Sequence, residues 1–260
     1  MMKLSWTATS AVACVVALSL EAIAIAGWSR PHSPSLPETA QLVQAPVAVV
    51  PAPVAAAAVS ATSEDGYYSQ LRGKVRWVET RIGSDKLLTP DASSRMLLAK
   101  SAAERAGLDE VGLSFKDVYG IINAETSWIP RLGASKDGTP NLGLAQFEPA
   151  TARALGLRDP NDPVEAIHVA ALLMKEAAEW SANRIAGLKL GDGERAQKLR
   201  EGVSIFYNLS TRGRNRWNGT NTAKLPIETR LHIRNARTGA QYAAELDAKQ
   251  ASSGFMLTGG

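Results

Sequence analysis

Residues 114–157 read SFKDVYGIINAETSWIPRLGASKDGTPNLGLAQFEPATARALGL. Ser114 and Asp117 have the spacing of a helix-opening capping box, with Asp in place of the usual Glu. A helix should therefore begin here and run to about Ser127, before Pro130. Its apolar residues recur three and four positions apart, as on one buried face. They are Phe115, Val118, Ile121 and Ile122.

Glu125 lies four residues after Ile121 and three after Ile122, so it continues this buried face. A carboxylate among apolar neighbours is costly unless it is paired. Its ionised form is then disfavoured, which makes it usable as a general acid near neutral pH. The ordinary alternative is a Glu paired with an Arg across a helix contact, and position alone favours that alternative.

The rest of the chain after residue 88 also predicts helices. Thr89-Pro90-Asp91 should precede a helix that runs to Ala106, with Gly107 as its stop. Further helices are expected from Asp162-Pro163 to about Ile185, from about Gly193 to Tyr207, and from Pro226 to about Gln250 with an interruption at Gly239. No alternating pattern of useful length predicts a strand. The expected fold class is all-α.

Composition excludes several classes of protein. The 260 residues include one cysteine, Cys14, and three widely separated histidines, so no disulfide framework, metal site or cofactor is expected. No phosphate-binding glycine motif is present. The net charge of +4 is too low for a dedicated nucleic-acid binder. The loop 212–219 interleaves arginines with Trp217, which fits either a glycan or nucleic-acid contact or, the favoured reading, a surface loop with Trp217 tucked in.

The N-terminus predicts export. Residues 1–26 have the basic start, apolar run and Ala-x-Ala end of a signal peptide. Residues 8–27 are also just long enough for a retained membrane anchor. A Pro/Ala-rich linker follows over 27–63, then a helical domain over 64–250 and a flexible tail over 251–260. The expected location is the periplasm, with the protein either free or anchored in the inner membrane.

Four short blocks that begin at Glu125 occur in the order of a known family. The sequence from residue 112 to about 236 resembles the catalytic domain of soluble lytic transglycosylases, the goose-lysozyme-like group. Departures from the family pattern are Thr126, Trp128, Ala145, Leu209-Ser210 and His232. The blocks are Glu125-Thr126-Ser127-Trp128 with Pro130, Gly143-Leu144-Ala145-Gln146 with Pro149-Ala150-Thr151-Ala152, Phe206-Tyr207-Asn208-Leu209-Ser210, and Leu225-Pro226-Ile227-Glu228-Thr229-Arg230-Leu231-His232.

The resemblance implies a lysozyme-like domain that cleaves the MurNAc–GlcNAc β-1,4 bond of peptidoglycan without metal or cofactor. Glu125 would act as acid and then as base. Thr126, Gln146, Tyr207 and Asn208 would bind substrate, with Tyr207 also orienting Glu125. The expected partner is the glycan strand. The linker would also suit a secretion, conjugation or flagellar assembly.

Two alternatives remain open at this point. The first is a hydrolase of the same bond, which would need a second acidic group. The second is a catalytically silent peptidoglycan-binding or scaffold protein, which the changes at Ala145, Ser210 and His232 leave open.

Overall fold

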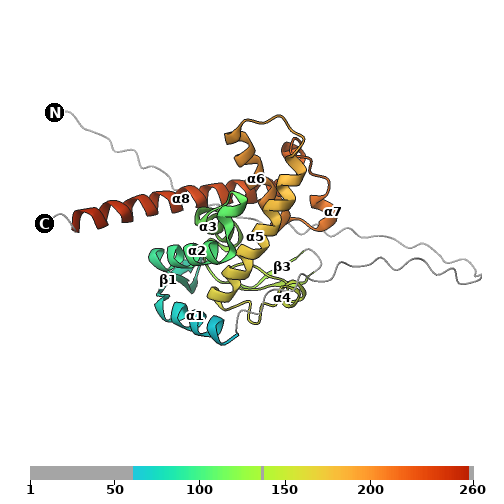
Figure 1. The fold of residues 1–260 in the computed structure, drawn as a ribbon. Helices are drawn as coiled ribbons and strands as arrows, with labels where there is room; N and C mark the ends of the chain where they lie inside the picture. Colours follow the sequence, from blue (N-terminus) through green and yellow to red (C-terminus); the bar gives the residue numbers. More distant parts are fainter. Residues whose placement is uncertain (1–60, 136–137, 258–260) are drawn as a thin grey trace, which may run out of the picture. The chain divides into compact units, whose positions relative to one another are not determined.

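The computed structural model describes residues 61–135 and 138–257, and these residues belong to one compact unit (Figure 1). The predicted signal peptide, the anchor and nearly all of the linker lie outside the described residues. The described part is mostly helical, as the sequence predicts. Its α-helices are α1 (Ala61–Lys74), α2 (Ala92–Ala106), α3 (Phe115–Thr126), α4 (Pro149–Ala154), α5 (Pro163–Ile185), α6 (Asp192–Asn208), α7 (Thr211–Arg214) and α8 (Ile227–Leu257).

The predicted helix starts are confirmed by their caps. Asp91 accepts a hydrogen bond from the backbone of Ser94 and opens α2, which Gly107 ends in a left-handed conformation. Ser114 and Asp117 form both halves of the capping box of α3. Asp162 caps α5 through the backbone of Val164. Each cap satisfies a backbone N–H that the helix leaves free and is worth about 1 kcal/mol.

Two expectations about the ends of the helical domain are wrong. The domain opens with α1 at Ala61, inside the stretch assigned to the linker. At the other end α8 continues through Gly239 and on to Leu257, so residues 251–257 form a helix where a flexible tail was expected. No helix within the described ranges is long and apolar enough to cross a bilayer.

The expectation of no strands is also wrong. Strand β1 (Trp77–Ile82) pairs antiparallel with β2 (Asp85–Pro90), so that Trp77 faces Pro90 and Ile82 faces Asp85. The two-residue loop places Gly83 at a φ of 59°, which glycine adopts without strain. Neither strand has a continuously buried face. Their sequences therefore lack the alternation of apolar and polar residues that would have predicted strands. A second, two-residue ribbon joins β3 (Gly133–Ala134) to β4 (Pro140–Asn141).

Two clusters of buried side chains form the core. The larger one lies among α2, α3 and α5, and it includes Trp128, Met174 and Tyr119. The smaller one surrounds Trp217, which is fully buried and stacks on Trp180 with ring centroids 5.7 Å apart. Its indole N–H donates to Thr222. Trp217 is therefore a core residue, as the favoured reading of its loop predicted, and its ring is not free to stack on a base or sugar.

Helices α3 and α8 lie side by side, and two glycines allow their close approach (Figure 1). A Cβ atom added to Gly120 would lie 2.3 Å from the backbone oxygen of Ala236, and one added to Gly239 would lie 2.6 Å from the Cβ of Asn123. Gly239 is therefore a helix-crossing residue, not the helix break that the sequence suggested. This crossing brings the start of α8 to the end of α3.

His168 is a buried packing residue between α1, α2 and α5. Its Nδ1 lies 2.7 Å from the carbonyl oxygen of Val164, which can only accept, so Nδ1 carries the proton. Its Nε2 then accepts from the hydroxyl of Ser101, 3.0 Å away. Burial lowers the pKa of His168 below its ordinary value of 6.5, because the positive charge would lose its hydration.

This burial predicts acid sensitivity of the fold. The unfolded chain protonates His168 near pH 6.5, whereas the folded protein does so only at lower pH. The stabilisation is therefore fully present above about pH 6.5 and is lost as the pH falls toward the folded pKa, by at most about 1.4 kcal/mol per pH unit. Urea unfolding at pH 7.5 and 5.5 should show a smaller loss for His168→Gln than for the wild type. Equal losses would contradict the prediction.

Candidate active site

Glu125 lies in the last turn of α3, just before a sharp turn of the backbone. Val118 and Ile122 of the same helix are fully buried, as the predicted stripe requires, and the Glu125 side chain retains 16% of its exposure. After Thr126 the chain enters the left-handed region at Ser127 (φ 55°) and Trp128 (φ 66°). This turn buries the Trp128 ring against Tyr119, with centroids 4.8 Å apart.

Backbone strain gathers around this segment. Among the described residues the non-glycine positions with positive φ are Ser127, Trp128 and Gln146. Such conformations cost on the order of 1–3 kcal/mol each and persist only where the surroundings enforce them. Here the burial of Trp128 and a hydrogen bond from Thr89 to its carbonyl oxygen (2.6 Å) supply that enforcement. The strained positions coincide with the blocks that the sequence marks as a site.

Glu125 is held by a histidine that was not assigned a role. His232 Nε2, from the second turn of α8, lies 2.8 Å from Glu125 Oε1, and the histidine side chain is only 5% exposed. Arg131 donates to the backbone oxygen of Glu125 (2.7 Å). No Arg or Lys in the described part of the chain forms an ion pair with the Glu125 carboxyl. The expected arginine partner is therefore absent from these residues, and the partner across the helix contact is His232, which pairs as an ion only when its ring is protonated.

Tyr207 lies beside Glu125 but does not hold it as expected. Its hydroxyl donates to the backbone oxygen of Ala145 (3.2 Å). Burial, and secondarily the negative charge of Glu125, raise the pKa of Tyr207 well above its ordinary value of 10, so the phenol stays neutral. The expected orienting role of Tyr207 is therefore corrected, because His232 provides the direct contact to the carboxyl.

The turn at residues 143–146 lies against the end of α3, to which Leu144 is bonded through Thr126. Gly143 is required there, because a Cβ would lie 1.9 Å from the backbone oxygen of Pro160. The Gln146 amide donates to the backbone oxygens of Gly143 and Arg131, both at 2.9 Å. Arg131 thus joins Gln146 to Glu125. Ala145 is fully buried. The smaller side chain at this position, relative to the family pattern, therefore does not change the exposed surface of the turn.

The other two predicted contact residues have internal partners. Thr126 is 1% exposed, and its hydroxyl donates to the backbone oxygen of Leu144 (3.0 Å), which ties α3 to the turn. This geometry supports a bracing role for Thr126 in place of direct substrate contact. Asn208 is exposed at the end of α6 and accepts from Thr229 of α8 (2.8 Å). Glu228, at the first turn of α8, is exposed, which fits its expected structural role.

The structure therefore brings four of the predicted site residues together around the end of α3 and the turn at 143–146: Glu125, Thr126, Gln146 and Tyr207. Asn208 makes no hydrogen bond to these four within the described part of the chain and is bonded to Thr229 of α8. Sequence reasoning treated His232 only as a departure from the family pattern. No local signal could have identified it, because His232 is 107 positions from Glu125 in the sequence. Within residues 61–135 and 138–257, no group of three or more His, Cys, Asp or Glu side chains is placed to hold a metal ion.

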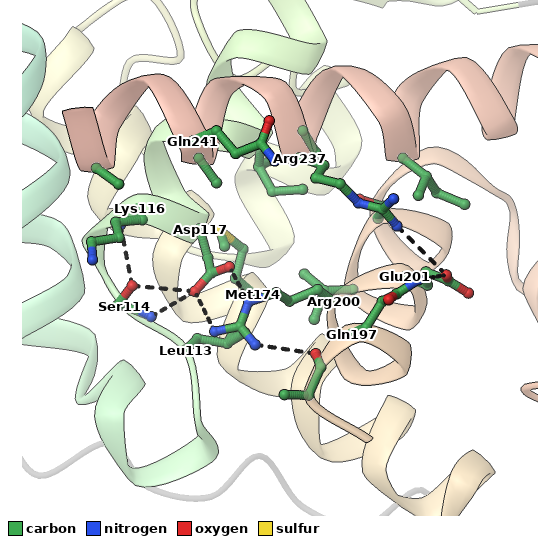
Figure 2. A pocket seen from close by; sticks show the side chains of 18 of the residues that line it. Leu113, Ser114, Lys116, Asp117, Met174, Gln197, Arg200, Glu201, Arg237 and Gln241 are labelled. Carbon is green, nitrogen blue, oxygen red and sulfur yellow. Dashed lines mark hydrogen bonds and ion pairs between the residues drawn. The ribbon is translucent and has the colours of Figure 1, made fainter. Parts of the chain in front are cut away.

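A cavity of about 420 Å³ lies elsewhere, between α3, α6 and α8. Figure 2 shows its charged members, with Arg200 reaching Asp117 (2.7 Å) and Arg237 turned toward Glu201 (3.7 Å). These carboxylates are thus neutralised within the cavity wall. None of the predicted site residues lines this cavity. The chemistry expected of Glu125 therefore does not take place there.

Comparison with known proteins adds no assignment. The sequence matches no protein-family model, no curated protein and no solved structure. The features that bear on function are therefore the geometry around Glu125 and the residues of the four sequence blocks.

Proposed function

We propose that the chain is a lytic transglycosylase that cleaves the MurNAc–GlcNAc β-1,4 bond of peptidoglycan, on a lysozyme-like helical domain. One observation carries the proposal. The carboxyl of Glu125 stands partly buried at a strained helix end, bound by His232 and flanked by the neutral phenol of Tyr207. Backbone strain of this kind clusters at active sites.

The reaction needs only one carboxyl. Protonated Glu125 gives its proton to the glycosidic oxygen as the bond from that oxygen to the anomeric carbon breaks. The resulting carboxylate then takes the proton from the C6 hydroxyl of the same sugar as that oxygen bonds to the anomeric carbon. The product is a 1,6-anhydro end, and Glu125 is again protonated. No water is consumed, in contrast to the two-carboxyl hydrolases.

The supporting roles follow the geometry. Gln146 and Asn208, which are partly or fully exposed, are the proposed sugar contacts. Thr126 and Tyr207 act by bracing the turn that carries Gln146. The N-terminal 27 residues would place the domain in the periplasm, where the glycan strands are its partner and a wall-spanning assembly is a further candidate.

The products decide between the two chemistries. Purified protein incubated with peptidoglycan should release muropeptides one water lighter than hydrolysed ones, as seen by mass spectrometry. Hydrated reducing ends would instead identify a hydrolase. Retention on the insoluble wall without any released product would identify a binding or scaffold protein, and either result would overturn the proposal.

A further inference from the structure

The contact between His232 and Glu125 fixes which atoms of the site carry protons. Both side chains are largely buried, with 5% and 16% exposure, and Nε2 lies 2.8 Å from Oε1. On the other side of the imidazole ring, Nδ1 is covered by protein and has no hydrogen-bonding partner among the described residues. The ring therefore has one satisfied nitrogen and one that is not.

Three protonation states of the ring can be compared. With the proton on Nδ1, a buried N–H has no acceptor. An imidazolium has the same orphaned N–H, and its buried positive charge is unpaired whenever Glu125 carries the proton that the acid step requires. With the proton on Nε2, the N–H donates to Glu125 Oε1, and only the acceptor Nδ1 is unused. Buried N–H groups without a partner are rarer and costlier than unused acceptors, so the last state is favoured.

We propose that His232 is a positioning residue, neutral with its proton on Nε2, that occupies Oε1 of Glu125 and leaves Oε2 as the oxygen that gives and takes the catalytic proton. The assignment of Oε2 rests on the proposed function, whereas the hydrogen bond and the ring protonation do not. Tyr207 does not compete for Oε1, because its hydroxyl is engaged by Ala145.

In this scheme one oxygen, Oε2 of Glu125, both gives and receives the proton that is transferred. The proton on Oε2 goes to the leaving glycosidic oxygen, and Oε2 later receives the proton of the C6 hydroxyl. The Nε2 proton stays on His232 throughout. Between the two steps it donates to a carboxylate, which is a stronger hydrogen bond than one to a neutral carboxyl. His232 thus contributes most when Glu125 is charged.

Two substitutions separate this role from simple packing. His232→Gln keeps an N–H donor near the position of Nε2, whereas His232→Leu has similar bulk and no donor. Loss of a hydrogen bond to a charged group should lower kcat of His232→Leu about 10- to 100-fold, with KM nearly unchanged. His232→Gln should recover most of this loss. Equal kcat in both variants, at melting temperatures equal to that of the wild type, would overturn the positioning role.

Nitrogen-15 NMR of the histidine rings tests the protonation without any turnover. In the full-length protein at pH 7, His232 should show a protonated Nε2 and a bare Nδ1, and His168 should show the opposite pattern, because its Nδ1 faces a carbonyl oxygen. His168→Gln and His232→Gln assign the signals. A protonated Nδ1 on His232 would overturn the inference even if the enzyme is active.

Failure of the two proposals can be told apart. If the wild type releases no product while His232 shows the Nε2 proton, the proposed function is wrong, and so is the catalytic role of Oε2. The hydrogen bond from His232 to Glu125 is still confirmed in that case. If the wild type releases anhydro products and the ring carries its proton on Nδ1, only the inference about His232 falls.

Discussion

We expect Glu125→Gln to lose nearly all of the proposed glycan cleavage while the protein keeps its fold. In the proposed reaction this one side chain supplies both the acid and the base, and general acid–base catalysis contributes typically 10²–10⁴-fold for a single role. We therefore expect kcat to fall by a factor of at least about 10³, equivalent to about 4 kcal/mol in the activation barrier. The rate of release of anhydro-muropeptides, followed by mass spectrometry, measures this loss.

The isosteric amide makes the result interpretable. The amide oxygen of the new side chain still accepts from His232 Nε2–H, so the link between α3 and α8 is retained. The melting temperature should stay close to that of the wild type. Glu125→Asp, which keeps the carboxyl but withdraws it by one methylene, should retain more activity than Glu125→Gln. A cleavage rate near that of the wild type in Glu125→Gln would exclude the mechanism.

The helix boundaries were predictable because helix caps are local. Asp91, Ser114 and Asp162 each bond a backbone N–H within three residues, so sequence spacing alone shows them. The hairpin of β1 and β2 was missed for the converse reason. Its strands are short and mainly exposed, so their residues show no alternation.

The candidate site was predictable in part. The place of Glu125 on a buried helix face follows from the 3.6-residue period. Its choice as the catalytic residue depended on the resemblance of the blocks that begin with it. Its partner could not be predicted, because His232 is 107 positions away and reaches Glu125 only through the crossing of α3 and α8. The strain at Ser127, Trp128 and Gln146 was equally hidden, since none of these residue types announces a left-handed conformation.

Gly120→Ala should destabilise the protein through the same crossing. The added Cβ would lie 2.3 Å from the backbone oxygen of Ala236, and backbone cannot rotate away as a side chain can. Overpacking of this kind costs about 1–3 kcal/mol and occasionally more. The helix preference of alanine over glycine returns about 1 kcal/mol. Because the clash is with backbone, we place the cost at the upper end of this range and expect a net loss of about 2 kcal/mol and a melting temperature lower by about 4–8 °C.

Gly193→Ala is the matched control, because it lies in the first turn of α6 and its added Cβ would meet nothing within 4 Å. It should leave stability unchanged or raise it slightly. An unchanged melting temperature in Gly120→Ala would mean that α8 moves freely against α3. In that event His232 would not be held firmly at Glu125, and a fall in kcat at temperatures where the variant is folded would report this displacement. One substitution thus tests both the crossing and the proposed role of His232, because Gly120 allows the close approach of the two helices that carry Glu125 and His232.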